Sequence, residues 1–562
     1  MTTRRAYREI LAIPEARALI TASASSQMGD WLYNAALLGY VYSATGSAAW
    51  VGAATIFRLL PYVLLGPIGG AIADRYDRRR VLLVGDLIRF ANMLALAAVV
   101  ALEAPVALVI ALTALASAAG TAEKPAAMAL LPKLVGEARL GPANALLHTV
   151  QDLGVVVGPA IGAVLLAVAP DEVAFLVNAL TFAVSAALIS TMKSHGVAAG
   201  VHHGDGAIAH IRHGLSTTRA TPFVIPLLVV VAMVELTYGA QTVQLVLYAE
   251  QRLNLGASGY GYLLAAAGVG GLLSAAINAR LTESSKISAI IVLAGGLFCA
   301  TQLAYAGSNS VVLALAATLI GGGGIVACEV VAETAIARVV APEVLGRVMG
   351  VFDALSVAAM VIGALLAPVL VSTTSLRTSL VVLGAATALI SLASRAALRG
   401  LDALSSQRVE ALASRVAVIE PLPIADGVPR LIIEQLAAAS QICPLPPGVD
   451  VVVQGAPAHA FYAVISGRVL VHRNGSEVLY LGPGDHFGER GLFDNAPRNA
   501  SVTTVEDTTL LRLEGDALLD ALQSSPTVLS AIDRATAPTR APTASQSTSL
   551  VDDPTWVEPV QA

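Results

Sequence analysis

The sequence has little charge, few aromatic residues and almost no cysteine. Charged residues make up 13% of its 562 residues and aromatic residues 5%, whereas soluble globular domains carry about 25% charged residues. The three cysteines, Cys299, Cys328 and Cys443, lie far apart along the chain, which indicates neither a disulfide framework nor a metal site. The composition therefore excludes an ordinary soluble protein.

Long apolar runs are what the sequence has in abundance, and its mean hydropathy is +0.72. A membrane-spanning helix needs about 20 mostly apolar residues, and twelve such runs precede residue 400. The sequence predicts an all-α membrane domain of twelve transmembrane helices. We expect the spans near Ala16–Ser43, Trp50–Ala73, Val81–Leu102, Pro105–Thr121, Ala143–Val168, Val173–Met192, Phe223–Tyr248, Gly259–Ala279, Ile287–Ala306, Val311–Ala337, Leu345–Val371 and Leu376–Ala397.

The basic residues of the loops predict the orientation of these spans. With twelve spans, nearly all loop Lys and Arg residues lie on one side, and the other side holds only Arg252 and Arg377. Loops rich in Lys and Arg face the cytosol. We therefore expect a multi-pass protein of the cell (plasma) membrane, surrounded by the lipid bilayer, with both termini cytosolic.

The loop between the second and third expected spans, Gly66–Arg80, combines glycines, acids and four arginines. A plain basic loop would explain the arginines but not Gly70 or Asp74. The pattern resembles the corresponding loop of the major facilitator superfamily, although Asp77 stands where that family usually has glycine. The resemblance implies a secondary transporter in which this loop takes part in conformational change. The residues that carry it are Gly70, Asp74, Arg75, Arg78 and Arg79.

An internal repeat supports two six-helix halves. Asp30 in the first span and Glu235 in the seventh are separated by 235 − 30 = 205 residues, and Gly158 and Gly363 by 363 − 158 = 205. Parallel repeats of this kind characterise the superfamily and place the substrate site near the midplane between the halves.

Several acids lie inside the apolar runs. An ionised carboxylate in hydrocarbon is costly, so it faces the bundle interior, pairs with a cation or takes up a proton. No basic residue lies mid-span near Asp30 or Glu235 in the sequence, so we expect at least one of them to carry a proton during transport; the alternative is a fixed partner for a cation. The candidate cavity and proton-coupling residues are Asp30, Glu235, Asp152 and Asp353. Two further acids are expected to form structural pairs, Glu123 with Lys124 and Glu333 with Arg338.

The run Gly154–Gly162 in the fifth span, with Pro159, resembles the helix-five motif of the superfamily's antiporters, although close helix packing alone would explain it. The segments Met28–Trp31, Thr45–Ser47 and Ala73–Arg75 resemble the exporter branch that includes the enterobactin exporter. The resemblance covers roughly residues 16–398. It implies export of a small molecule by alternating access and does not name the cargo.

After Arg399 the character of the chain changes. Residues 402–440 are charged and helical in pattern, and short alternating runs punctuated by glycine follow. Such runs predict a small antiparallel barrel or jelly roll. We expect strands at Val449–Gln454, Ala460–Ser466, Val469–Arg473, Val478–Leu481, Ala500–Thr504 and Thr509–Leu513.

The segment Gly484–Val502 within this region can bind a phosphate. A helical turn near Glu489 would present backbone N–H groups to an anion, and Arg498 can make a bidentate contact with a phosphate. The segment closely resembles the phosphate-binding cassette of cyclic nucleotide-binding domains, over about residues 430–525. The resemblance implies that Glu489 holds the ribose 2′-hydroxyl and that the partner of Arg498 is the cyclic phosphate. The implied site residues are Gly488, Glu489, Arg490, Gly491, Arg498, Asn499, Ala500 and Ser501.

Two departures from that family concern the base of the nucleotide. Asn499 stands where cAMP readers often have alanine and cGMP readers threonine. The helix expected near Asp516–Gln523 is too short for the family's usual lid. The sequence therefore does not fix which base the site binds, although cAMP is favoured over cGMP. A segment that covers the base must come from another part of the protein.

Taken together, the motifs predict a transporter that carries a cytosolic cyclic nucleotide sensor. No nucleophile–base constellation, Walker motif or metal cluster is visible, so we expect no enzymatic activity, no metal and no nucleic acid partner. One alternative is a transporter whose barrel serves as a docking module and binds no nucleotide. Another is a cyclic nucleotide receptor whose membrane half does not transport. The expected divisions are a cytosolic N-terminus (1–15), two six-helix halves (16–193 and 223–398) joined by a polar loop (194–222), a linker (399–429), the nucleotide-binding domain (430–525) and a disordered tail (536–562).

Overall fold

A computed structural model describes residues 3–136, 139–193, 223–284, 286–340, 342–425, 428, 430–493 and 496–518. The expected loop 194–222 between the halves and the expected tail 536–562 lie outside the described residues.

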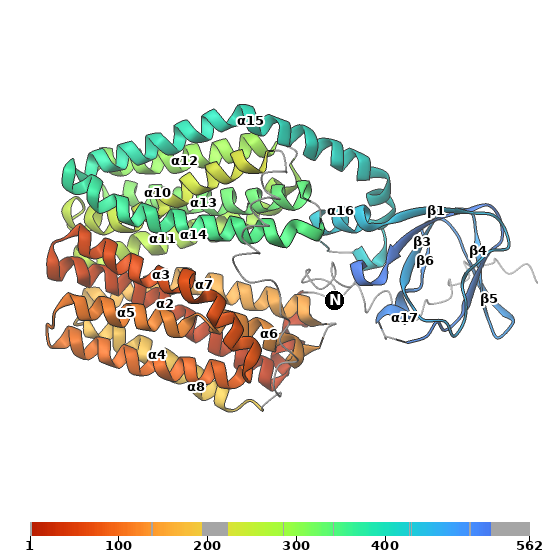
Figure 1. The fold of residues 1–562 in the computed structure, drawn as a ribbon, viewed down its shortest axis with the longest axis horizontal. Helices are drawn as coiled ribbons and strands as arrows, with labels where there is room; N and C mark the ends of the chain where they lie inside the picture. The colour runs from red at the N-terminus through yellow and green to blue at the C-terminus, as the bar shows by residue number, and fades with distance from the viewer. Residues whose placement is uncertain are drawn as a thin grey trace, which may run out of the picture.

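A bundle of long helices fills the first three quarters of the chain (Figure 1). Among the described residues, eleven helical segments are long and apolar enough to cross a membrane, with α5 and α6 counted as one. The long helix α2 falls outside this set but packs against α7 and α8 within the bundle, and with it the number of long helices equals the twelve expected spans. The N-terminal half consists of α2 (Pro14–Thr45), α3 (Ala48–Arg75), α4 (Arg78–Ala101), α5 (Val106–Gly120), α6 (Glu123–Val135), α7 (Leu140–Val168) and α8 (Glu172–Ser190), preceded by α1 (Thr3–Ala12). The C-terminal half consists of α10 (Val224–Gln251), α11 (Gly256–Glu283), α12 (Ile287–Gly307), α13 (Val311–Val339), α14 (Pro342–Thr373) and α15 (Leu376–Ile419).

The internal repeat is visible in the packing of glycines. Gly158 on α7 lies against Trp31 and Met28 of α2, so closely that a side chain there would clash. Gly363 on α14 lies in the same way against Leu236 of α10. Because 236 − 31 = 205 and 363 − 158 = 205, the two contacts are equivalent positions of the two halves. Small residues let the helices of each half approach at the same point.

The close approaches between the two halves lie away from the β-strands. We call the end of the bundle where α15 leaves toward the strands the β end, and the opposite end the far end (Figure 1). Near the far end, a Cβ added to Gly52 would lie 2.7 Å from Pro368 Cγ, and one added to Gly261 would lie 2.7 Å from Ala163 Cβ. Gln251 Nε2 also donates to the Tyr42 hydroxyl there, at 2.7 Å. The halves are therefore joined tightly at the far end.

The last helix of the bundle runs beyond the expected span. We expected the twelfth span to end near Ala397, but α15 continues without a break to Ile419 and is 44 residues long. No proline interrupts it before Pro421, and good helix formers such as Ala, Leu, Gln and Arg dominate its second half. The expected domain boundary between residues 398 and 399 is therefore wrong as a structural break, since it falls inside one helix.

The C-terminal domain contains two four-stranded antiparallel sheets with the orders β1-β8-β3-β6 and β2-β7-β4-β5. Its start is formed by the short helix η2 (Pro423–Ala425) and by α16 (Arg430–Ala439), and α17 (Glu489–Phe493) lies between β6 and β7. The sequence did not predict β1, which contains Pro444, or the two-residue strand β6. The strands are β1 (Gln441–Leu445), β2 (Asp450–Val452), β3 (Ala460–Ser466), β4 (Val469–Arg473), β5 (Ser476–Leu481), β6 (His486–Phe487), β7 (Ser501–Thr504) and β8 (Thr508–Glu514).

The first of these sheets has an apolar core on each face. Alternate residues of a strand point to opposite faces. Accordingly, Leu510 of β8 packs with Val469 and Val502 between the sheets, while Leu511 and Leu513 pack on the other side with helices. The helical residues of this second core include Leu412, Val416 and Ile419 of α15 together with Ile433 and Leu436 of α16. The end of the last bundle helix is thus part of the core of the C-terminal domain.

Candidate functional sites

A network of three carboxylates surrounds Arg89 in the N-terminal half. The Arg89 guanidinium lies 3.3 Å from Asp30, 3.0 Å from Asp86 and 2.5 Å from Glu123. Arg89 comes from α4, within the third expected span, and its side chain is 3% exposed. The expectation that no basic residue lies near Asp30 is therefore wrong, because helix packing brings the span-three arginine to it.

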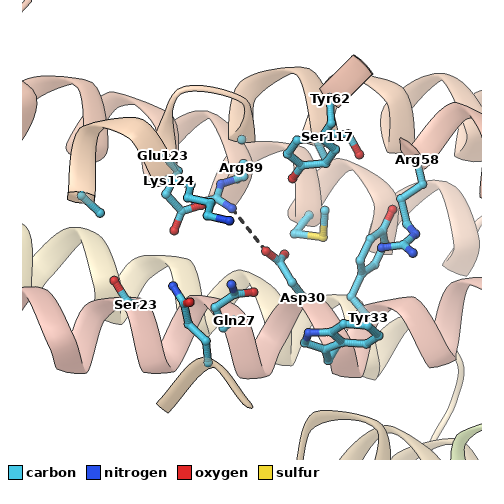
Figure 2. A pocket seen from close by; sticks show the side chains of 16 residues that line it. Ser23, Gln27, Asp30, Tyr33, Arg58, Tyr62, Arg89, Ser117, Glu123 and Lys124 are labelled. Carbon is cyan, nitrogen blue, oxygen red and sulfur yellow. Dashed lines mark hydrogen bonds and ion pairs between the residues drawn. The ribbon is translucent and has the colours of Figure 1, made fainter. Parts of the chain in front are cut away.

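This network forms one wall of a cavity of about 300 Å³ (Figure 2). Asp30, Arg89 and Glu123 are the network members on the wall, while Asp86 is buried behind them and accepts a hydrogen bond from Ser185 at 2.6 Å. Arg58 of α3 and the aromatic side chains Tyr33 and Tyr62 face the same space (Figure 2). The cavity thus combines charges of both signs with aromatic surface.

Two expected structural pairs are replaced by other partners. Glu123 pairs with Arg89 rather than with the neighbouring Lys124. Arg338, at the end of α13, makes two hydrogen bonds, of 3.0 and 3.3 Å, to Glu434 of α16 rather than to Glu333. Both side chains of this second pair are almost fully buried, with 4% and 8% exposure. The pair therefore ties the β end of the bundle to the first helix of the C-terminal domain.

The four candidate acids do not form one site. Glu235 is half-buried on α10, and among the described residues no cation forms an ion pair with it. Asp353 on α14 is exposed, and the side chain of Asp152 is not among those that the structure describes. The two repeats differ because the position equivalent to Arg89, 89 + 205 = 294, holds Ala294. Asp30 therefore has a cation partner that Glu235 lacks.

The residues of the loop Gly66–Arg80 have separate local roles. Asp77, the departure from the family pattern, is the N-cap of α4 and accepts from the backbone N–H of Arg80 at 2.9 Å; acceptor side chains at this position satisfy free N–H groups. Arg79 donates to the carbonyls of Ile189 and Ser190 at the end of α8, at 3.1 and 2.6 Å.

The other residues of the loop lie at the surface of the bundle. The Arg75 guanidinium lies 6.0 Å from the centre of the Tyr76 ring. Asp74 is exposed, Arg78 is partly buried, and an added Cβ at Gly70 would meet no atom within 4 Å. The space around Gly70 is therefore open, whereas a Cβ added to its neighbour Gly69 would lie 2.6 Å from the Thr121 carbonyl oxygen.

In the cassette, Arg498 is held by the domain itself. Its guanidinium donates to the backbone carbonyls of Gly488 at 2.6 Å and Ala460 at 2.5 Å, and the residue is 8% exposed. Burial lowers the pKa of Arg498 below its ordinary value, because the charged guanidinium loses hydration. The expectation that its partner is the ligand alone is wrong, since Arg498 also braces the start of α17 against β3.

Glu489 has a buried carboxylate oxygen that is free to accept a hydrogen bond, and glycines surround it in the chain. Glu489 Oε2 is buried and has no hydrogen-bond partner among the described residues, and a buried carboxylate oxygen without a donor is costly. Gly488 has φ = +96°, and a Cβ there would lie 2.8 Å from Arg498 Nη1, so only glycine fits this position. A Cβ added to Gly491 would lie 2.7 Å from Ala458 Cβ.

Of the remaining cassette residues, Asn499, Ala500 and Ser501 follow α17 and lie around the start of β7. The carbonyl of Asn499 accepts from Arg473 Nε at 3.0 Å, and the Ser501 hydroxyl accepts from the backbone N–H of Gln454 at 2.9 Å. Ala500 is half-buried beside them, and Arg490 is exposed at the first turn of α17. The structure thus brings Gly488–Gly491 and Arg498 together, with Asn499–Ser501 directly after them.

The family models agree with both parts of this architecture. A model described as transmembrane secretion effector matches residues 11–422. The chain belongs to this family. A second model, described as cyclic nucleotide-binding domain, matches residues 443–525. The chain is therefore a major facilitator superfamily transporter fused to a cyclic nucleotide-binding domain.

Curated relatives divide between the two parts of the chain. The putative bacilysin exporter BacE of Bacillus subtilis is 27% identical over 376 residues, which cover 64% of this chain and 90% of the relative. Macrolide efflux protein A of Streptococcus pyogenes is 32% identical over 24% of this chain and 33% of its own length. The CRP-like cAMP-activated global transcriptional regulator of Mycobacterium tuberculosis is 34% identical over 19% of this chain and 49% of its own. The chain therefore matches only between a third and a half of the length of the macrolide efflux protein and of the CRP-like regulator.

Among solved structures, the nucleoside transporter NupG matches 68% of this chain and 99% of its own, with a TM-score of 0.58 and 12% identity. This likeness supports the fold of the helix bundle.

Sequence reasoning missed Arg89, Arg58 and Glu434. The two arginines were visible as basic residues inside apolar runs, which is a signal in itself. Glu434 lies in a charged, helical segment where nothing in the pattern distinguishes it from its neighbours.

Proposed function

We propose that this transporter exports a small molecule in exchange for protons by alternating access, and that a cyclic nucleotide bound to its C-terminal domain changes the transport rate. The observation that carries the proposal is α15: one helix completes the bundle and supplies part of the core of the C-terminal domain. A change in that core is therefore transmitted to a helix of the transport machinery without a flexible joint.

Export is supported by the relatives and by charge. Two relatives bear the names of exporters. The excess of loop Lys and Arg lies at the β end, which makes that end cytosolic. Because the halves are joined at the far end, we infer that the cavity beside Asp30 opens toward the cytosolic side in this conformation. This is the conformation in which an exporter loads its cargo.

Glu235 is the favoured proton carrier. Asp30 is held by Arg89, whereas Glu235 has no cation partner in the part of the chain that the structure describes. An acid within a membrane bundle that lacks a cation partner is less costly when protonated. The Glu235 carboxyl group can therefore take up a proton in one transport conformation and release it in the other conformation, where water reaches the side chain.

In the cassette, the orphaned Glu489 Oε2 suits the ribose hydroxyl and Arg498 suits the cyclic phosphate. To meet a phosphate, Arg498 exchanges one of its bonds to the Gly488 and Ala460 carbonyls, which releases the start of α17 from β3. The name of the cAMP-activated relative favours cAMP.

Proteoliposomes with the C-terminal domain facing the added solution provide the test. A cargo is first chosen from a ligand screen scored by thermal shift of the purified protein, and its transport is then measured with cAMP, with cGMP and without nucleotide. We expect a pH gradient to drive uphill transport and cAMP to change its rate about 5- to 150-fold, the usual range for allosteric coupling. If cAMP binds but the rate stays constant, the domain is a docking module. If cAMP binds and no cargo moves, the membrane half is a receptor.

A further inference from the structure

Arg58 lies where a membrane protein rarely tolerates an unpaired cation. It occupies the middle of α3, a helix that spans the membrane, with apolar residues around it in the chain. A charged side chain at this depth is costly, and such residues pair or line a cavity. Arg58 does line the cavity beside Asp30 (Figure 2). Within the described ranges no carboxylate forms an ion pair with it, and its Nε is buried without a hydrogen-bond partner.

The acids of the cavity are already committed to another cation. Asp30 and Glu123, the acids on its wall, bind Arg89 together with Asp86. Arg89 is therefore neutralised by three carboxylates, while Arg58, on the other side of Asp30 in Figure 2, has none of its own. This asymmetry leaves one guanidinium with free donors that face the cavity.

The helix that carries Arg58 also borders the other half of the bundle. Helix α3 packs against α14 and α10, which both belong to the C-terminal half. In transporters built from two repeats, substrate sites lie at this interface. Tyr33, Tyr62 and Trp31, which line the cavity, offer flat, largely apolar surfaces on which an aromatic body can pack.

We propose that the cargo carries an oxyanion group, a carboxylate or a phosphate, and that Arg58 binds it. The planar guanidinium presents paired donors that match two oxygens of such a group. The aromatic residues beside it then hold the apolar or aromatic part of the cargo. A cavity of about 300 Å³ lies at the lower end of the range for small-molecule sites, so the cargo is a small organic anion or zwitterion. This inference rests on the proposed transport function and names the substrate class of that site.

The test uses the purified full-length protein and four probes with one aromatic body. Naphthoate and naphthyl phosphate carry an oxyanion, naphthamide is uncharged and naphthylmethylammonium is cationic. Binding is measured by calorimetry and thermal shift for the parent, Arg58→Gln, Arg58→Lys and a control, Arg377→Gln, which removes one exposed cation at the far end of α15. We expect one or both oxyanion probes to bind the parent and the control, and the other two probes to bind at least tenfold more weakly.

Arg58→Gln should weaken the oxyanion probes at least tenfold, which equals about 1.4 kcal/mol. Arg58→Lys should restore part of the affinity, since it keeps the charge but not the fork of donors; this variant also decides the matter if Arg58→Gln fails to fold. The inference is overturned if no oxyanion probe binds up to its solubility limit, if the amide or the ammonium probe binds as tightly, or if Arg58→Gln leaves the affinity unchanged. In those cases pH-driven transport of a screened cargo still tests the export proposal separately.

Discussion

Arg89 is the residue on which the buried acids of the N-terminal half depend. Its guanidinium is shared by Asp30, Asp86 and Glu123, and no single one of them is its only partner. Loss of one carboxylate leaves a cation with two partners, whereas loss of the cation leaves three acids together. Removing one member of a buried ion pair costs about 3–5 kcal/mol, mostly because the other charge stays buried and unpaired.

The first prediction follows from this imbalance. Arg89→Met should lower the thermal stability of the purified transporter strongly and reduce its yield, while Asp30→Asn should change both only slightly. Fluorescence-detected thermal unfolding in detergent measures the difference. The double variant Arg89→Met/Asp30→Asn should recover part of the loss. Equal stability of Arg89→Met and the parent would show that the network does not hold the bundle together.

The second prediction separates the two repeat-related acids. Glu235→Gln should abolish uphill, pH-driven export in proteoliposomes but leave downhill exchange of cargo intact, because a permanently neutral side chain cannot release a proton. Asp30→Asn should retain uphill export at a reduced rate, since its carboxylate is held by Arg89. The proposal for Glu235 is wrong if Glu235→Gln concentrates the cargo as well as the parent does.

The third prediction concerns Arg498 in its two roles. Arg498→Ala should abolish detectable cAMP binding and also destabilise the C-terminal domain by about 2 kcal/mol, because the carbonyls of Gly488 and Ala460 lose a charged donor. Calorimetry reports the binding, and pulse proteolysis of the intact protein reports the stability. The matched control is Arg473→Ala, whose exposed guanidinium also donates to a backbone carbonyl, that of Asn499; it should change the stability by less than about 0.5 kcal/mol.

At the scale of elements, α15 and α16 join the two parts of the protein. The end of α15 packs against the β1-β8-β3-β6 sheet, and α16 is tied to the end of α13 by the buried Arg338–Glu434 pair. A shift of the sheet therefore acts on two helices of the C-terminal half, one through apolar packing and one through an ion pair. A ligand can move this equilibrium only by its difference in affinity for the two arrangements.

The fourth prediction tests this connection. Glu434→Gln should keep cAMP affinity within a few-fold of the parent but weaken the effect of cAMP on the transport rate, since α13 is no longer held. The charge swap Arg338→Glu/Glu434→Arg should restore part of the effect. Arg468→Gln, which breaks an exposed pair with Glu506 on the same domain, serves as the control and should behave like the parent. If Glu434→Gln responds to cAMP fully, the signal passes through α15 alone.

At the scale of the whole molecule, the basic loops of the helix bundle predict on which side of the membrane the C-terminal domain lies. The C-terminal domain continues from the β end of the bundle, where the basic loops also lie (Figure 1). Cyclic nucleotides act as regulators only if this end faces the cytosol.

The fifth prediction tests this orientation by cysteine labelling in intact cells. In a background with the three native cysteines replaced by serine, an impermeant reagent should label Asn309→Cys, in the far-end loop between α12 and α13. It should not label Glu477→Cys, on the exposed strand β5, until the cells are made permeable. Labelling of Glu477→Cys in intact cells would show that the C-terminal domain lies outside the cell, which contradicts the predicted orientation of the twelve spans.

Much of this architecture could be predicted from the sequence because its signals are local. The twelve apolar runs predict helices of membrane-spanning length, since no other structure satisfies the backbone of a single segment in lipid. The glycines at Gly158 and Gly363 mark the repeat because only close helix contact requires them. The cassette residues Glu489 and Arg498 lie nine positions apart and could be recognised together.

The charge pairing was decided only by the tertiary structure. Asp30, Arg89 and Glu123 come from three helices, and no spacing along the chain shows which side chains meet when those helices pack. The same holds for Arg338 and Glu434, which are 96 residues apart, and for Arg58, whose lack of an ion-pair partner among the described residues becomes visible only when the helices have packed. Helix formation depends on residues a few positions apart, whereas the partner of a buried charge depends on which faces of distant helices turn toward one another.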